Sequence, residues 1–129
     1  MSDERYERGM ITRRGVLGEE HVARATANAT EFTRDFQELI TRYAWGEVWS
    51  RPGLDRAMRS LLTIAMMAAL GRHEELRLHI RATRNTGVTR DQVKEVLLMV
   101  AIYAGVPAAN SAFAAASDEY RELDEENER

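Results

Sequence analysis

The sequence has no cysteine, only two prolines and a single lysine among its 129 residues. Without cysteine, disulfide bonds, thiolate metal sites and thiol catalysis are all excluded. All of its basic residues except Lys94 are arginine, so Schiff-base chemistry has one candidate. A chain of this length buries enough surface for a stable core without covalent cross-links. We therefore expect one domain spanning residues 1–129.

Strong net charge and long apolar runs are also missing. The net charge is −3, and residues 118–129 carry −5 of it, which leaves +2 on residues 1–117. So weak a positive charge argues against nucleic acid or anionic lipid as a partner. The longest apolar run, residues 61–70, is interrupted by Thr63 and is too short to span a membrane, and the charged start is unlike a signal peptide. We expect a cytoplasmic protein that binds neither nucleic acid nor membranes.

Apolar residues recur at helical rather than alternating spacing along the chain, which predicts an all-α fold of about six to seven helices. One stripe, at Phe32, Phe36, Leu39, Ile40 and Tyr43, predicts an amphipathic helix with one buried face. The expected helices cover residues 3–14, 19–28, 32–45, 54–70, 72–85, 90–104 and 108 onward.

Several helix ends carry their own signals. Gly15 and Gly18 predict the end of the first helix, and Gly71 predicts the end of the helix before it. Gly87 stands where a left-handed cap is expected. Thr89-Arg90-Asp91-Gln92 predicts a capping box. The acidic tail from about residue 123 is expected to be disordered, with its acids in solvent.

Two expected helices, at residues 61–70 and 93–104, are apolar around most of their circumference. A helix without a polar face must lie at the centre of the fold or be covered by another subunit. We infer a homo-oligomer. The alternative is a monomer in which the two helices cross at the centre.

A first candidate site lies around His79. His73 and His79 are six residues apart, about 240° around a helix, so they do not share a face as zinc-binding histidines do. Glu75 and His79 are four apart and do face each other. A carboxylate there would raise the pKa of the imidazole and fix its tautomer, as a general acid or base requires. The alternative is an ordinary surface pair.

A second candidate site lies in residues 45–53, which show no sustained period and end in a Pro-Gly turn. Trp45 and Trp49 stand beside Glu47 and Arg51, which suggests an apolar wall with an anion clamp. Alternatively, the tryptophans simply seal one end of the bundle.

Other polar residues are less specific. Arg59 precedes the most apolar helix, where an arginine either extends to water or meets an anion. His21 is a lone histidine on a short helix and is typical of a structural residue. Arg13 and Arg14 suggest a solvated face or a contact between subunits.

Seven stretches resemble the 4-carboxymuconolactone decarboxylase family of protocatechuate breakdown. They run over roughly residues 8–120, and the tryptophan segment is the most specific because short members of the wider superfamily lack it. The matching stretches are residues 13–18, 21–22, 36–49, 51–54, 59–62, 79–82 and 103–109.

The wider superfamily includes alkyl hydroperoxidase D, which carries Cys-x-x-Cys-x-x-x-His and an upstream glutamate. Aligned on His79, the cysteine positions fall on Arg72 and Glu75, and the glutamate position falls on Ser60. The resemblance therefore implies an alkyl hydroperoxidase D-like helical bundle without peroxidase activity.

The family resemblance further implies a homo-oligomer, usually a hexameric ring, that decarboxylates 4-carboxymuconolactone to 3-oxoadipate enol-lactone in the β-ketoadipate pathway. No metal and no organic cofactor are expected. On this hypothesis His79 and Glu47 are catalytic, handling the oxyanion and the proton. The residues expected to bind or surround the substrate are Arg51, Arg59, Trp45, Trp49, Glu75 and His21. The alternatives are a related lactone or enol-acid lyase and a non-catalytic oligomeric module that binds a ligand.

Overall fold

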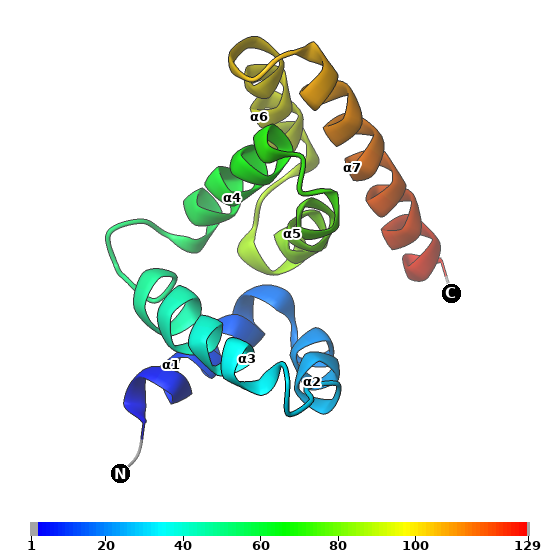
Figure 1. Ribbon diagram of the computed structural model, residues 1–129. Helices are drawn as coiled ribbons and strands as arrows, with labels where there is room; N and C mark the ends of the chain where they lie inside the picture. The colour runs from blue at the N-terminus through cyan, green and yellow to red at the C-terminus, as the bar shows by residue number, and fades with distance from the viewer. Residues whose placement is uncertain (1–2, 129) are drawn as a thin grey trace. The chain divides into compact units, whose positions relative to one another are not determined.

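The computed structural model describes residues 3–128, and all regular structure in that range is helical, as predicted (Figure 1). No helix in this range is long and apolar enough to cross a membrane. The elements are α1 (Glu4–Leu17), α2 (Glu19–Ala27), α3 (Arg34–Ile40), the π-helix η1 (Thr41–Val48), α4 (Arg56–Leu70), α5 (His73–Thr86), α6 (Arg90–Tyr103) and α7 (Val106–Asn127).

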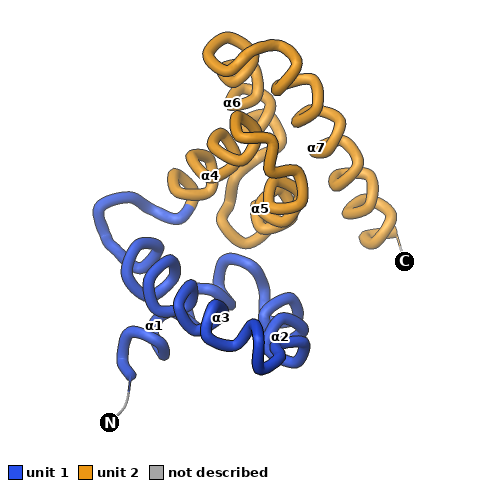
Figure 2. Tube along the Cα trace, in the orientation of Figure 1, with its two compact units in different colours: residues 1–56 blue, residues 57–129 orange. Residues whose placement is uncertain are grey.

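The chain forms two compact units, coloured separately in Figure 2. The N-terminal unit, residues 1–56, contains α1, α2, α3 and η1. The C-terminal unit, residues 57–129, contains α4 from its second residue onward, with α5, α6 and α7.

Two glycines bring α1 and η1 into close contact in the N-terminal unit. A Cβ atom on Gly9 would lie 2.0 Å from the carbonyl oxygen of Thr41, and one on Gly46 would lie 2.3 Å from that of Arg5. The side chain of Arg8 crosses the same contact and donates from Nε to the Gly46 carbonyl at 2.9 Å. Only glycine allows two helix backbones to approach this closely.

The first helix continues beyond Gly15, which was wrongly expected to end it. It runs to Leu17 and ends at Gly18, whose φ of +93° is left-handed. A glycine inside a helix costs only about 1 kcal/mol relative to alanine. Packing of the buried residues Val16 and Leu17 just beyond it offsets that cost.

The predicted end of the third helix near Trp45 is also wrong. The chain continues as a π-helix to Val48, and the backbone N–H of Trp49 donates to the carbonyl of Ala44, five residues earlier, at 2.9 Å. A π-helix has a wider turn than an α-helix. The α-helical period is therefore lost in this segment although the helix continues.

The stripe over α3 and η1 does not form the buried face that its spacing predicts. The side chain of Phe32 is 94% exposed and that of Phe36 is 59% exposed in the single chain, and Leu39 and Tyr43 are also exposed. Thr41 and Trp45 are the buried side chains of this segment. The exposed stripe is a surface that the N-terminal unit does not cover.

All four helices of the C-terminal unit contribute to its core. Helices α5 and α6 both pack against α7, and Ile64 and Ala68 of α4 join them. The predicted stop at Gly71, the left-handed cap at Gly87 and the Thr89–Gln92 capping box are all confirmed. The buried core residues are Ile64, Ala68, Leu76, Ile80, Val88, Val93, Leu97, Val100, Ala109, Ala112 and Ala116.

The disordered tail expected from about residue 123 is not observed, because α7 continues to Asn127. Glu119 is 5% exposed and accepts from Arg77 Nε at 3.0 Å and Arg81 Nε at 2.8 Å. Asp124 pairs with Arg90 at 2.5 Å, and Leu123 is buried. Arginines of α5 and α6 therefore neutralise acids that were expected to be solvated.

We predict that Gly9→Ala and Gly46→Ala each destabilise the protein by about 2–3 kcal/mol or more, because the new methyl group meets backbone atoms that cannot move aside. Urea denaturation followed by circular dichroism measures the change. Gly53→Ala is the control, because no described atom lies within 4 Å of the place that its new methyl group would take. Equal stability of all three variants would contradict the close crossing.

Candidate active site

The two tryptophans of η1 and its C-cap lie against each other. Their ring centroids are 4.9 Å apart and their planes differ by 30°, so the rings are stacked. Trp45 is buried at 6% exposure, whereas Trp49 is half-buried. The pair therefore presents an apolar surface that is buried at Trp45 and partly open to solvent at Trp49.

Glu47 and Arg51 form the acid–arginine pair beside these rings. Their side chains approach to 3.5 Å between Glu47 Oε1 and Arg51 Nη1, and Arg5 of α1 lies 3.7 Å from Glu47 Oε2. Both arginines are substantially exposed, so a carboxylate from solution can reach them. Sequence reasoning missed Arg5, because nothing in its local pattern points to η1.

Hydrogen bonds fix the end of η1 onto α1. Ser50 Oγ donates to the carbonyl of Trp45 at 2.6 Å, and Thr12 Oγ1 lies 2.8 Å from Ser50 Oγ. Thr12 is buried on α1. The tryptophan segment is thus held at a fixed position by α1, as a preorganised site requires.

Three predicted site residues belong to the C-terminal unit. His79 is buried near the middle of α5, and Glu75, one turn before it, is exposed. Arg59 is half-buried on the first turn of α4. His73 is exposed, unlike His79, which agrees with their predicted separation around the helix.

The structure therefore brings together four of the eight predicted site residues, all in the N-terminal unit: Trp45, Glu47, Trp49 and Arg51. The orientation of His79 by Glu75, and the meeting of His79 and Arg59 with the tryptophan segment, stay predictions. In the described range, no three histidine, aspartate or glutamate side chains are grouped so that they could hold a metal ion.

His21, the eighth predicted residue, is half-buried on α2. Burial lowers the pKa of its imidazole, and the nearby positive charges of Arg13 and Arg24 lower it further. It is therefore a neutral imidazole near neutral pH, suited to donate or accept one hydrogen bond.

Arg13 was expected on a solvated face or at a subunit contact, and this interpretation is wrong within the N-terminal unit. The residue is buried at 6% exposure and donates to Thr41 Oγ1 at 3.2 Å and Gln37 Oε1 at 3.1 Å. Burial lowers the pKa of its guanidinium. An exposed arginine at this position would give the same local sequence pattern, so sequence reasoning had no signal for its burial.

The structure defines an all-helical protein in which a stacked tryptophan pair and an acid–arginine pair lie in one segment of the N-terminal unit. The chain belongs to the carboxymuconolactone decarboxylase family, whose profile matches residues 34–118. That match includes the tryptophan segment, Arg59, Glu75 and His79.

Three curated relatives have related names. The chain is 53% identical over 124 residues to the 4-carboxymuconolactone decarboxylase of Acinetobacter baylyi. The aligned region covers 95% of this chain and 92% of the relative. It is 48% identical over 103 residues to the nitrosuccinic acid decarboxylase of Metarhizium robertsii, an alignment that covers 80% of this chain and 72% of the relative. It is also 48% identical over 44 residues to a 4-carboxymuconolactone decarboxylase of Pseudomonas putida, an alignment that covers 34% of this chain and 92% of the relative.

We predict that acidification destabilises the protein partly through His21. Its folded-state pKa is below the unfolded value of 6.5, so the unfolded state binds the proton first and stability falls as pH drops below that value. Melting temperatures measured between about pH 7.5 and pH 5 should fall less steeply for His21→Gln than for the parent. The exposed His73→Gln is the control, and identical slopes for His21→Gln and the parent would refute the role.

Proposed function

We propose that this chain is a carboxy-lyase that converts 4-carboxymuconolactone to 3-oxoadipate enol-lactone in the β-ketoadipate pathway, using no cofactor. The observation that carries the proposal is the 53% identity, over 95% of the chain, to the decarboxylase of Acinetobacter baylyi. A cytoplasmic location accords with this metabolic role. The family match at residues 34–118 runs through both units, which supports one decarboxylase domain.

The substrate explains why the site needs no external electron sink. 4-Carboxymuconolactone is an unsaturated lactone with one carboxylate on the ring and another on an acetate arm. When CO2 leaves the ring carbon, its electron pair moves through the ring double bond to the lactone carbonyl. The protein then has to hold two carboxylates, stabilise the oxyanion and deliver a proton to carbon.

The ion pair of Glu47 and Arg51 suggests how binding and proton transfer are linked. A substrate carboxylate that reaches Arg51 competes with Glu47 for its guanidinium, and Glu47 is then available to the reacting end of the substrate. Arg5 keeps contact with the other oxygen of Glu47 and limits its movement. Arg59 takes the second carboxylate.

The remaining roles concern the reacting carbon. The stacked surface of Trp45 and Trp49 excludes water from the leaving carboxylate, which favours loss of neutral CO2. His79 and Glu47 together stabilise the oxyanion and transfer the proton. Glu75 orients the His79 imidazole, and His21 lies at the rim of the substrate site.

A second candidate substrate is nitrosuccinic acid, because the chain is 48% identical to a relative named for its decarboxylation. In that acid, a nitro group next to a carboxylate can also accept the electron pair that CO2 leaves behind. Both substrates are dicarboxylic acids with an internal electron sink, so one set of cationic and acid–base groups could serve either.

A direct comparison of the two substrates tests the proposed function. Purified protein is given freshly prepared 4-carboxymuconolactone or nitrosuccinate, and CO2 release is measured with and without EDTA. Faster turnover of the lactone, unchanged by EDTA, supports the proposal, and faster turnover of nitrosuccinate supports the second candidate. If neither releases CO2 but the lactone binds, the non-catalytic module is favoured.

We predict that His79→Gln lowers kcat/KM for the lactone by about 100-fold or more, the range expected for a positioned acid or base. The exposed His73→Gln is the matched control and should stay within about threefold of the parent. Circular dichroism and urea denaturation check that His79→Gln is folded, because His79 is buried. Parent-like turnover by the folded variant would remove His79 from the mechanism.

The proposed assembly is a homo-oligomer, a hexamer by resemblance to the family. Its support is the uncovered apolar surface of the single chain. In the C-terminal unit, α4 and α6 line an apolar groove of about 550 Å³ and leave Met58, Leu62, Met66, Met99 and Tyr103 exposed. A monomer rarely leaves so much contiguous apolar surface in water.

We predict that Met66→Glu lowers the molecular mass observed by sedimentation velocity, because a second copy would bury this carboxylate in an apolar interface. Ser111→Glu, which places the same group at an exposed polar position of α7, should leave the mass unchanged. A monomeric parent, or a Met66→Glu variant with the parental mass, would contradict this interface.

A further inference from the structure

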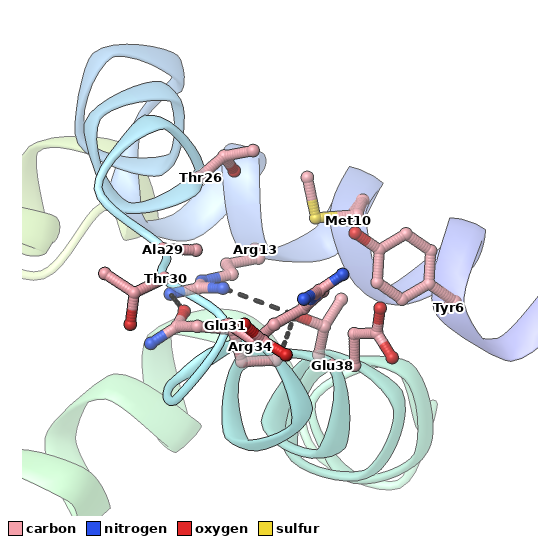
Figure 3. Close-up of a pocket in the computed structure, with 11 residues that line it drawn as sticks. Tyr6, Met10, Arg13, Thr26, Ala29, Thr30, Glu31, Arg34 and Glu38 are labelled. Atoms are coloured by element: carbon pink, nitrogen blue, oxygen red, sulfur yellow. Dashed lines mark hydrogen bonds between the residues drawn. The ribbon is translucent and has the colours of Figure 1, made fainter.

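The N-terminal unit contains a cavity of about 400 Å³ between α1, the end of α2 with the segment that follows it, and the start of η1 with α3 (Figure 3). Every lining residue belongs to this unit, and none of them is among the predicted substrate-binding residues. They are Tyr6, Met10, Arg13, Thr26, Ala29, Thr30, Glu31, Arg34, Gln37, Glu38 and Thr41.

Arg13 supplies the cavity with a buried cation that has no counterion among residues 3–128. Its two hydrogen-bond acceptors, Thr41 Oγ1 and Gln37 Oε1, are neutral. Its Nε atom is buried without a hydrogen-bond partner, and no described carboxylate lies within ion-pair distance of the guanidinium. Burying a charge is costly unless it is paired, so this site is electrostatically incomplete.

The other charged groups of the cavity favour an anion of low charge. Arg34 adds a second cation that makes no ion pair within residues 3–128, and Glu31 adds an acid. Glu38 lies 3.8 Å from Arg42, which partly neutralises it. Two acids in the lining disfavour a group that carries two charges itself, such as phosphate, whereas a single carboxylate group restores the balance around Arg13.

The hydroxyl groups of the lining complete a site for such a ligand. Tyr6 and Thr26 bring two hydroxyls to the lining of the cavity that holds the Arg13 guanidinium (Figure 3), whereas Thr30 Oγ1 already accepts from the backbone N–H of Thr33 at 3.3 Å. Hydroxyl groups can donate to carboxylate oxygens or accept from ligand hydroxyls. The volume accommodates a small organic acid.

We propose that this cavity binds a small organic carboxylate, paired with Arg13 and supported by Arg34. The proposal does not rest on the decarboxylase activity, because none of the residues that carry it belongs to the proposed catalytic group. A ligand there would contact Thr41, the first residue of the π-helix that carries Trp45 and Glu47.

Sodium acetate is the probe that tests this site. The 1H–15N resonance of Arg13 Nε is followed during titration of the full chain, at ionic strength held constant with sodium chloride. We expect a saturable shift. Arg34→Gln should weaken acetate binding about two- to fivefold and Glu31→Gln should strengthen it similarly, the range for single charges near a protein surface.

Arg14→Gln is the matched control, because Arg14 is exposed and does not line the cavity, and its acetate affinity should equal that of the parent. The variants at Arg34 and Glu31 leave the buried Arg13 in place, so the test does not require a substitution that could prevent folding. A shift that does not saturate, equal affinity in all variants, or tighter binding of inorganic phosphate than of acetate would overturn the proposal.

Steady-state kinetics with the lactone show whether the carboxylate that binds this cavity belongs to the substrate or to a separate organic acid. A higher KM with unchanged kcat in Arg34→Gln identifies the substrate itself as the ligand. Unchanged kinetics with weakened acetate binding identifies a separate organic acid. If the chain lacks decarboxylase activity altogether, the acetate titration still decides the cavity proposal.

Discussion

The close contact between α1 and η1 is the constraint on which the N-terminal unit depends. Because Gly9 and Gly46 have no side chains, the two backbones approach until carbonyl oxygens occupy the space of a methyl group. Thr12 and Ser50 then meet across the same crossing, and Ser50 holds the carbonyl of Trp45. The packing of the two backbones therefore helps to position the segment that carries the tryptophans and Glu47.

The same crossing explains the burial of Arg13. This residue lies on α1 one turn beyond Gly9 and reaches Thr41, the first residue of η1. Thr41 Oγ1 in turn donates to the Gln37 carbonyl at 2.7 Å, at the junction of α3 and the π-helix. A cation at this junction links the cavity to the helix that carries the aromatic surface, although the two groups of residues are distinct.

Features encoded locally could be predicted from the sequence, whereas those made by distant partners could not. The glycine stops at Gly71 and Gly87 and the Thr89 capping box depend on neighbouring residues, and all are confirmed. The structure stacks Trp45 on Trp49 and pairs Glu47 with Arg51, each at a four-residue spacing, although the sequence shows no sustained helical period there. The π-helix, the burial of Arg13 and the ordered end of α7 depend on side chains more than 20 residues away, and a local pattern does not contain them.

The interactions that hold α7 against the other helices of its unit change from apolar contacts near its start to ion pairs near its end. Ala109, Ala112 and Ala116 near its start are buried in the core, Glu119 is a buried acid between two arginines, and the final turns are held by exposed ion pairs. Added salt screens exposed charges but leaves apolar contacts nearly unchanged. Amide hydrogens of the last turns should therefore exchange with solvent first, and the difference in protection between the two ends of the helix should widen as ionic strength rises.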